Sequence, residues 1–330
     1  MSGVLLLLTH GRVLRRGARD PERLDLAVGK DGRITALMPS IPPGAAERVI
    51  DLHGKLVTPG LVDAHQHLDK SRTRRLVANP AGTLEGASAA YRTFAVRATR
   101  ADIIGRAERT LDICLAHGTV AIRNHTNIES ESGLRAFEAM IELRERRRDR
   151  ITLQVVAHLT SDAPRNLAAA RAWLEAAIAA GADAIGGVPQ YADEPLAFLD
   201  LLFEFAERSG LPLDMHVDEH LDCGRLLFDA VIERTRAHGM QGRVTAGHCC
   251  ALSAMPRDEA RRIIANFAAA GISVITLPAA ILGLGASWGI AIGARADLLI
   301  ADAEDVEDLV ATGAKNRAVL VAGRLVAGTL

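Results

Sequence analysis

The sequence is poor in aromatic residues and almost free of net charge, and each shortage excludes a class of partner. Phe, Trp and Tyr make up 3% of the 330 residues, and the formal net charge is −1. Few aromatic side chains leave little material for a surface on which single-stranded nucleic-acid bases could stack. A balanced charge creates no field that would attract nucleic acid or an anionic membrane. We therefore expect no nucleic-acid partner and no membrane partner.

Cysteines in CxxC spacing and long apolar runs are also missing. None of the four cysteines are spaced as CxxC, so the sequence indicates no disulfide framework. Reduced thiols are typical of a cytoplasmic protein, which is the location we expect. No stretch approaches the ~20 apolar residues that a membrane span needs. The apolar run at residues 5–8 lacks the basic flank and cleavage site of a secretory signal, and we interpret it as part of a first strand.

The two ends of the chain share one pattern, short apolar stretches separated by turns. Residues 30–33 read Lys-Asp-Gly-Arg, which is a good hairpin turn. Similar short strands return near the end, from residue 298 onwards. Because chain termini often lie close together, we predict that residues 1–56 and 286–330 form one small β domain.

The middle of the chain, residues 57–285, alternates short apolar runs with Ala-, Leu- and Arg-rich helical stretches. This alternation predicts a parallel sheet covered by helices. Chemically active residues at the strand ends favour a (β/α) TIM-type barrel over an open sheet. We count seven barrel strands and not eight, so the predicted fold class is α/β with an incomplete barrel and a small β domain. The predicted barrel strands are 56–62, 119–123, 153–157, 184–188, 213–216, 243–246 and 272–277.

Three of these apolar runs end in histidines. The first leads to His65 and His67, the fifth to His216 with Glu219 close behind, and the sixth to His248. Because side chains alternate along a strand, histidines at positions i and i+2 point the same way and can offer two imidazoles to one metal ion. Imidazole nitrogen suits zinc and iron. Three such endings in one chain indicate a metal-dependent site.

The ordered set of motifs resembles the amidohydrolase superfamily, and within it the cytosine deaminase-like branch. TPGLVDAHQHLDK (58–70) looks like the first barrel strand of that family. HVDEHLD (216–222) is similar to its fifth-strand motif and TAGHCCALS (245–253) to its sixth. GIAIGARADLLIAD (289–302) resembles the strand that returns to the small β domain. The resemblance covers nearly the whole chain.

The resemblance implies a role for five residues and one cofactor. His65, His67 and His216 would be ligands of one divalent metal ion, zinc or iron. Glu219 would shuttle a proton, and His248 would assist at the reacting centre. In chemical terms, a glutamate in this place could take a proton from water and return it to a leaving nitrogen.

Two features of the family are missing from the sequence. The remaining metal ligand of the family is an Asp that ends the eighth strand, and the chain passes from the seventh strand to what looks like the tail of the eighth helix at residues 280–284. A β-α unit takes ~30 residues or more, so the block missing between these two points is a substantial internal deletion relative to the family. Some superfamily members bridge two metals with a carbamylated lysine, but no lysine lies between Lys70 and Lys315, which favours the mononuclear deaminase type.

Two further residues are candidates for substrate binding. His125 ends the second predicted strand, where it either lines the pocket or caps the loop. Gln190 follows the fourth strand, where it either hydrogen-bonds a ring amide or is a solvated loop residue. His158 ends the third strand, but no motif assigns it a role.

These observations leave three hypotheses open. The first is a metal-dependent deaminase of cytosine or a related nitrogen heterocycle, in which water attacks a ring carbon and ammonia leaves. The second is the removal of an alkylamine from a triazine-like cyclic amidine by the same machinery. The third is a non-catalytic remnant whose deletion removed the acidic ligand. The expected partner is a small heterocyclic substrate, and the sequence leaves a homo-oligomer open.

Overall fold

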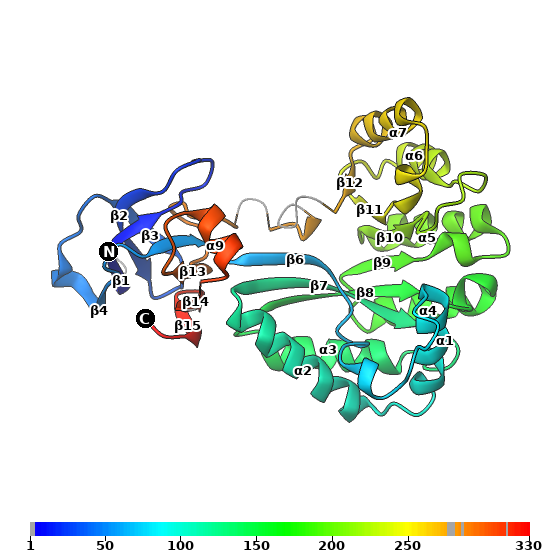
Figure 1. Ribbon diagram of the computed structural model, residues 1–330, viewed down its shortest axis with the longest axis horizontal. Coiled ribbons are helices and arrows are strands. Elements are labelled where there is room, and N and C mark those ends of the chain that lie inside the picture. Colours follow the sequence, from blue (N-terminus) through cyan, green and yellow to red (C-terminus); the bar gives the residue numbers. More distant parts are fainter. Residues whose placement is uncertain (1–3, 276–280, 285–286, 315) are drawn as a thin grey trace.

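The computed structural model describes residues 4–275, 281–284, 287–314 and 316–330, and these form two lobes (Figure 1). The lobe on the left of Figure 1 is a β-sheet that contains both ends of the chain, and the lobe on the right carries a curled parallel sheet with most of the helices. This confirms the predicted class, a seven-stranded part of a TIM-type barrel joined to a small β domain built from both termini.

The small sheet has eight strands, and its three late strands lie together and join the early strands where β13 pairs with β5. Strand β13 lies between β5 and β14 and is antiparallel to both, so the end of the chain is hydrogen-bonded directly to its beginning. Its core is apolar and includes Leu8, Leu26 and Leu320. The members are β1 (Val4–Val13), β2 (Glu22–Gly29), β3 (Ile34–Met38), β4 (Ala46–Asp51), β5 (Leu56–Pro59), β13 (Leu298–Ala301), β14 (Arg317–Val321) and β15 (Arg324–Gly328), with helix α9 (Val306–Thr312) beside them.

The larger sheet consists of seven parallel strands in sequence order, and within the described residues β6 and β12 do not pair with each other. Its strands are β6 (Leu61–Gln66), β7 (Thr119–Ile128), β8 (Thr152–Leu159), β9 (Ala184–Gly187), β10 (Leu213–Val217), β11 (Val244–His248) and β12 (Ile272–Val274). The end of the predicted seventh strand, 276–277, lies outside the described residues.

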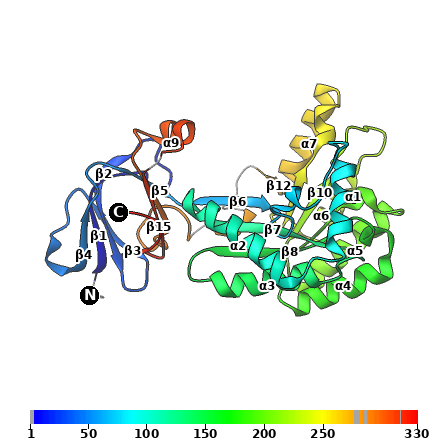
Figure 2. The same cartoon turned by 60° about the horizontal axis from the view of Figure 1, so that its bottom comes forward.

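Helices cover the outside of the half-barrel (Figures 1 and 2). They are α2 (Arg100–Ala116), α3 (Arg135–Arg147), α4 (Leu167–Ala179), α5 (Pro195–Ser209), α6 (Phe228–Ala237) and α7 (Arg257–Ala269), whereas α1 (Leu84–Ala95) lies at the carboxyl ends of the strands. Local signals set their ends: the Thr99 hydroxyl accepts a hydrogen bond from the Asp102 N–H at the start of α2, and Gly210 adopts a left-handed φ of 74° after α5. In the described part of the chain, no helix combines the length and the apolar character that a membrane crossing requires.

The chain passes from the small sheet to the barrel at Gly60. The predicted strand 56–62 is two strands, β5 in the small sheet and β6 in the barrel, and they separate at this glycine. A Cβ atom on Gly60 would lie 2.5 Å from both γ-methyl carbons of Val120, so no larger residue fits without a shift. The crossing therefore depends on the close approach of β5, β6 and β7.

A short apolar segment, residues 281–284, occupies the gap between the first and last barrel strands. Ile281 and Leu282 are buried against Ala64 of β6 and Ala121 of β7. Ile275, the residue after β12, packs against the same cluster. The segment therefore covers apolar surface of β6 and β7, in a cluster that also includes the residue after β12.

Candidate metal and catalytic site

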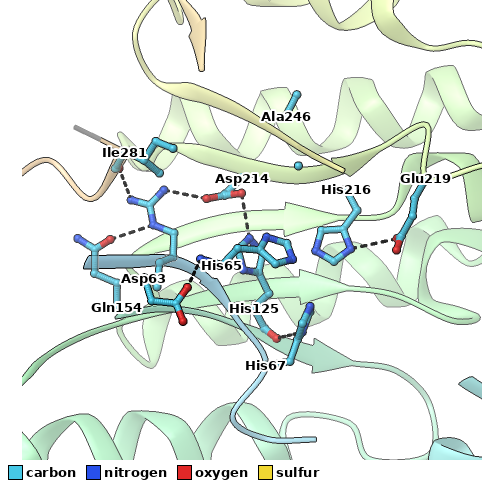
Figure 3. Close-up of polar contacts among 12 residues, drawn as sticks. Asp63, His65, His67, His125, Gln154, Asp214, His216, Glu219, Ala246 and Ile281 are labelled. Carbon is cyan, nitrogen blue, oxygen red and sulfur yellow. Dashed lines mark hydrogen bonds and ion pairs between the residues drawn. The ribbon is translucent and has the colours of Figure 1, made fainter. Parts of the chain in front are cut away.

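The candidate residues lie at the carboxyl ends of three barrel strands, the side on which TIM-type barrels carry their active sites. His65 is in β6 and His67 follows it, His216 is in β10, and His248 ends β11. Glu219 lies in the loop after β10. The folding of consecutive β-α units places these strands around one interior, so residues distant in sequence meet (Figure 3).

One group of three histidines has the geometry of a metal site. One ring nitrogen each of His65, His67 and His216 lies within 4.8 Å of the other two. Nδ1 of His67 donates to the backbone carbonyl of His125 at 2.8 Å, which leaves its Nε2 free. Both ring nitrogens of His65 and Nε2 of His216 are buried and make no hydrogen bond in the described part of the chain. Buried nitrogens without partners are costly, and a divalent ion would use their lone pairs, so the residues fit the metal that the sequence implies.

Glu219 lies beside this group, between two histidines. Its Oε2 is 3.5 Å from Nδ1 of His216, and its Oε1 is 3.4 Å from Nδ1 of His248. His216, Glu219 and His248 also offer ligand atoms within 4.8 Å of one another. Within the described residues, Glu219 is the one carboxylate in these two candidate metal groups.

Burial keeps the histidines of the site neutral. It lowers the pKa of His65 to about 3, with the nearby His125 and His248 adding to the effect. Burial also holds the pKa values of His67 and His216 well below the usual range. Neutral imidazole is the form that binds a metal ion.

Burial shifts the pKa of the Glu219 carboxylate upwards, the opposite of its effect on the histidines. The positive charge of Lys70 opposes only part of this rise. A carboxylate with a raised pKa is a better acceptor for a proton at neutral pH. The pKa of His248 is lowered by burial and by the charges of His125 and Lys70.

These residues open onto a cavity of about 350 Å³. Helix α1 closes one side of it with Leu84, Ser88 and Tyr91. The sequence patterns did not single out α1, because it lies in a connection between strands and carries no motif. Other polar residues of the lining lie at or after strand ends, and only Lys70 among them belongs to a motif quoted above. They include Lys70, Asn127, Thr160, Ser161 and Tyr191.

The two candidate substrate-binding residues are not in the lining of this cavity. His125 is fully buried, with its ring centroid 4.3 Å from that of His65 and its Nε2 2.9 Å from Oδ1 of Asp214. With its amide turned to suit its neighbours, Gln190 donates to the His216 carbonyl at 3.0 Å and accepts from the Glu219 N–H at 3.3 Å. Both residues contact other residues of the site from outside the cavity, and their contact with substrate stays a prediction. His158, by contrast, lines the cavity and has a buried Nδ1 without a partner in the described chain.

Comparisons with known proteins agree with this geometry. The profile of the amidohydrolase family Amidohydro_3 matches residues 72–278. Pterin deaminase of Rhizobium rhizogenes is 35% identical over 257 residues, which are 78% of this chain and 58% of that protein. N-isopropylammelide isopropyl amidohydrolase of a Pseudomonas species is 28% identical over 241 residues, which are 71% of this chain and 59% of that protein. This chain therefore spans less than two thirds of the length of these relatives.

Solved structures give the same picture of the fold. The 5-methylcytosine deaminase of Klebsiella pneumoniae superposes with a TM-score of 0.86 at 22% identity, over 98% of each chain. N-isopropylammelide isopropylaminohydrolase of Burkholderia multivorans superposes with a TM-score of 0.82 at 26% identity, also over 98% of each chain.

Proposed function

Because the chain belongs to the amidohydrolase family, we propose that it is a metal-dependent hydrolase of non-peptide C–N bonds, a deaminase of cytosine or a related nitrogen heterocycle. The observation that carries this proposal is the convergence of His65, His67 and His216, with Glu219 beside them at the floor of a cavity. Two relatives that support it, the pterin and 5-methylcytosine deaminases, remove an amino group from a heterocycle.

Each residue has a task in such a reaction. His65, His67 and His216 would hold one zinc or iron ion, which when bound lowers the pKa of water and so supplies a nucleophile near neutral pH. Glu219 accepts a proton from the attacking water and delivers it to the leaving nitrogen. His248 lies across Glu219 from His216 and hydrogen-bonds the group under attack. The partly enclosed cavity limits access of bulk water to these groups.

The cavity also bears on the substrate. Its volume of about 350 Å³ is at the small end of the range for small-molecule sites, which suits a compact heterocycle of one or two rings. The removal of an alkylamine from a triazine-like ring is the second candidate, and the likeness to two N-isopropylammelide hydrolases supports it. Both reactions use the same machinery and differ in the leaving nitrogen.

A non-catalytic remnant is the third candidate, and one observation favours it. The group of three histidines has no carboxylate among its members. An anionic ligand strengthens the hold on a divalent cation and changes the charge that acts on its water. The loss of such a ligand would weaken both metal binding and turnover.

We also propose that the protein acts in the cytoplasm on a small molecule. The four cysteines are free thiols, which suits a reducing compartment. The oligomeric state stays open.

Metal content and turnover together test these candidates. The purified chain is loaded with zinc or ferrous iron, its metal stoichiometry is measured, and ammonia or amine release is followed with cytosine, pterin and N-isopropylammelide. One bound metal per chain with ammonia release from cytosine or pterin supports the deaminase. Amine release from N-isopropylammelide, without ammonia release from cytosine or pterin, supports the second candidate. The absence of turnover of all three substrates, with or without added metal, supports the remnant.

Histidine variants show whether the proposed residues hold the metal. His65→Asn should abolish stoichiometric binding, because it removes one of three ligands. His238→Asn is the matched control, since His238 pairs with Glu207 on the outside of the barrel. Equal metal content in both variants would show that the ion binds elsewhere.

A further inference from the structure

Arg123 lies inside the half-barrel, and its guanidinium connects three separate parts of the chain. The side chain is 2% exposed. Its Nη1 donates to Oδ2 of Asp214 at 2.9 Å, and its Nε donates to Oε1 of Gln154 at 2.9 Å. Its Nη2 donates to the carbonyl of Ile281 at 2.7 Å. A buried guanidinium is stable only when its donors are satisfied in this way.

One direction of this network leads to the metal site (Figure 3). Asp214 is fully buried, and its second oxygen lies 2.9 Å from Nε2 of His125. Burial alone would raise the pKa of Asp214, but His125 and Arg123 outweigh it and hold the pKa below its usual value. The carbonyl of His125 in turn accepts the hydrogen bond from Nδ1 of His67. The contacts from Arg123 thus end at a candidate ligand.

The other direction leads to the segment that covers the gap in the barrel. Nε2 of Gln154 donates to the carbonyl of Leu282 at 3.0 Å, next to the carbonyl that Arg123 holds. The side chains of Ile281 and Leu282 pack on β6 and β7. The side chains of Arg123 and Gln154 therefore hydrogen-bond the backbone of the segment, while the apolar side chains of the segment pack on β6 and β7.

We propose that Arg123 is a positioning residue that couples closure of the half-barrel by residues 281–284 to the orientation of His67, and so sets the affinity of the metal site. The proposal rests on the proposed function, because it requires a metal at the three histidines. The hydrogen bond to the His125 carbonyl fixes the tautomer and ring direction of His67, and Asp214 holds the side chain of the same His125. The removal of a residue that orients a metal ligand typically changes metal affinity ~10–100-fold.

The test compares two arginines that bridge an aspartate and a carbonyl. Arg123→Met removes the proposed positioning residue. Arg144→Met is the control, because Arg144 donates to Oδ2 of Asp183 at 2.7 Å and to the carbonyl of Gly181 at 2.8 Å on the outside of the barrel. Zinc affinity is measured by competition with a chromophoric chelator, and the visible absorption of the cobalt-substituted protein reports the coordination geometry.

We expect Arg123→Met to bind zinc at least ~10-fold more weakly and to have an altered cobalt spectrum, with Arg144→Met like the parent in both. An Arg123→Met protein with parental affinity and spectrum would overturn the inference while leaving the proposed function intact. A parent chain that binds no zinc would overturn the proposed function and this inference with it. If Arg123→Met does not fold by circular dichroism, Asp214→Asn replaces it, because it keeps the side-chain shape and removes the charge, and the same outcomes apply.

Discussion

At the scale of single residues, the site depends on imidazoles that burial keeps neutral. The pKa of His158 is also held well below its usual range by burial first and by its neighbour His125 second. Its ring centroid is 4.2 Å from that of His216, so the same surroundings act on both. An imidazole that stays neutral in the folded chain but is protonated in the unfolded chain makes stability depend on pH.

The metal-free protein should therefore lose stability as the pH falls below about 6.5. In the unfolded chain a histidine binds a proton near pH 6.5, but the folded pKa of His65 is about 3, so between these values the unfolded state holds more protons. Each such histidine lowers the free energy of unfolding by up to ~1.4 kcal/mol per pH unit. Urea unfolding in the presence of chelator, repeated at decreasing pH, measures this slope.

Two variants test whether buried histidines cause the dependence of the unfolding free energy on pH. His158→Gln should give a shallower dependence on pH, because one buried imidazole is gone. His117→Gln is the control, because the exposed His117 ring hydrogen-bonds a backbone carbonyl, that of Ile113 at 2.8 Å. It should change the slope less than His158→Gln does. Equal slopes in His158→Gln and the parent would show that other groups cause the loss.

Glu219 permits a second prediction at this scale. Glu219→Gln should keep the metal and lower turnover by ~10²-fold or more, because the amide cannot accept the proton. Glu131→Gln is the control, since Glu131 pairs with Arg92 and is outside the cavity lining. Metal content and turnover are measured on the same samples. Loss of the metal in Glu219→Gln would make Glu219 a ligand and would count against its assignment as proton carrier.

At the scale of elements, the crossing between the two sheets at Gly60 has a strict packing requirement. The backbone N–H of Gly60 donates to the carbonyl of Asp297 at 2.9 Å, and the next N–H, of Leu61, donates to Gly118 at 2.8 Å. Two consecutive backbone N–H groups, those of Gly60 and Leu61, therefore bond to segments beside the small sheet and the barrel in turn. Val120 of β7 fills the space where a side chain at position 60 would lie.

Gly60→Ala should destabilise the protein by about 1–3 kcal/mol, because the new methyl group overpacks Val120. The free energy of unfolding in urea measures the loss. Val120→Ala in the Gly60→Ala background should recover part of it, because it removes both methyl groups that the new Cβ meets. Gly44→Ala is the control, since a Cβ there meets no atom within 4 Å. Additive losses in the double variant would contradict this explanation.

At the scale of the whole molecule, the seven-stranded half-barrel leaves two strand edges that do not pair with each other in the described chain. Unpaired edges and uncovered apolar faces favour aggregation. The segment 281–284 reduces this exposure, because Ile281 and Leu282 are buried against residues of β6 and β7. Within the described residues, side chains of this segment and no further strand cover the apolar surface there.

Leu282→Ala should lower the free energy of unfolding by about 2 kcal/mol and increase the binding of a hydrophobic dye, because it leaves a void in this closure. Ile292→Ala is the matched control, since Ile292 is 70% exposed and its truncation should change stability by less than about 0.5 kcal/mol. Equal stability of the two variants would show that the segment does not close the barrel.

The sequence by itself determined the fold class, the seven barrel strands and the family. These follow from local patterns: apolar runs that alternate with helical stretches, histidines at strand ends and family motifs in order, all of which can be recognised without a three-dimensional structure. The internal deletion relative to the family stays a prediction, drawn from the family motifs before and after the missing block.

Only the tertiary structure decided what surrounds those residues. Strand 56–62 reads as one apolar run, and its division at Gly60 depends on Val120, which lies 60 residues later. The place of His125 behind the cavity depends on Asp214, and the role of residues 281–284 depends on Arg123 and Gln154. Such contacts join residues far apart in the chain, and no local period or spacing records them. The sequence therefore determined which groups could hold a metal, whereas the packing of distant strands decided which of them meet, how burial shifts their pKa values and what closes the barrel around them.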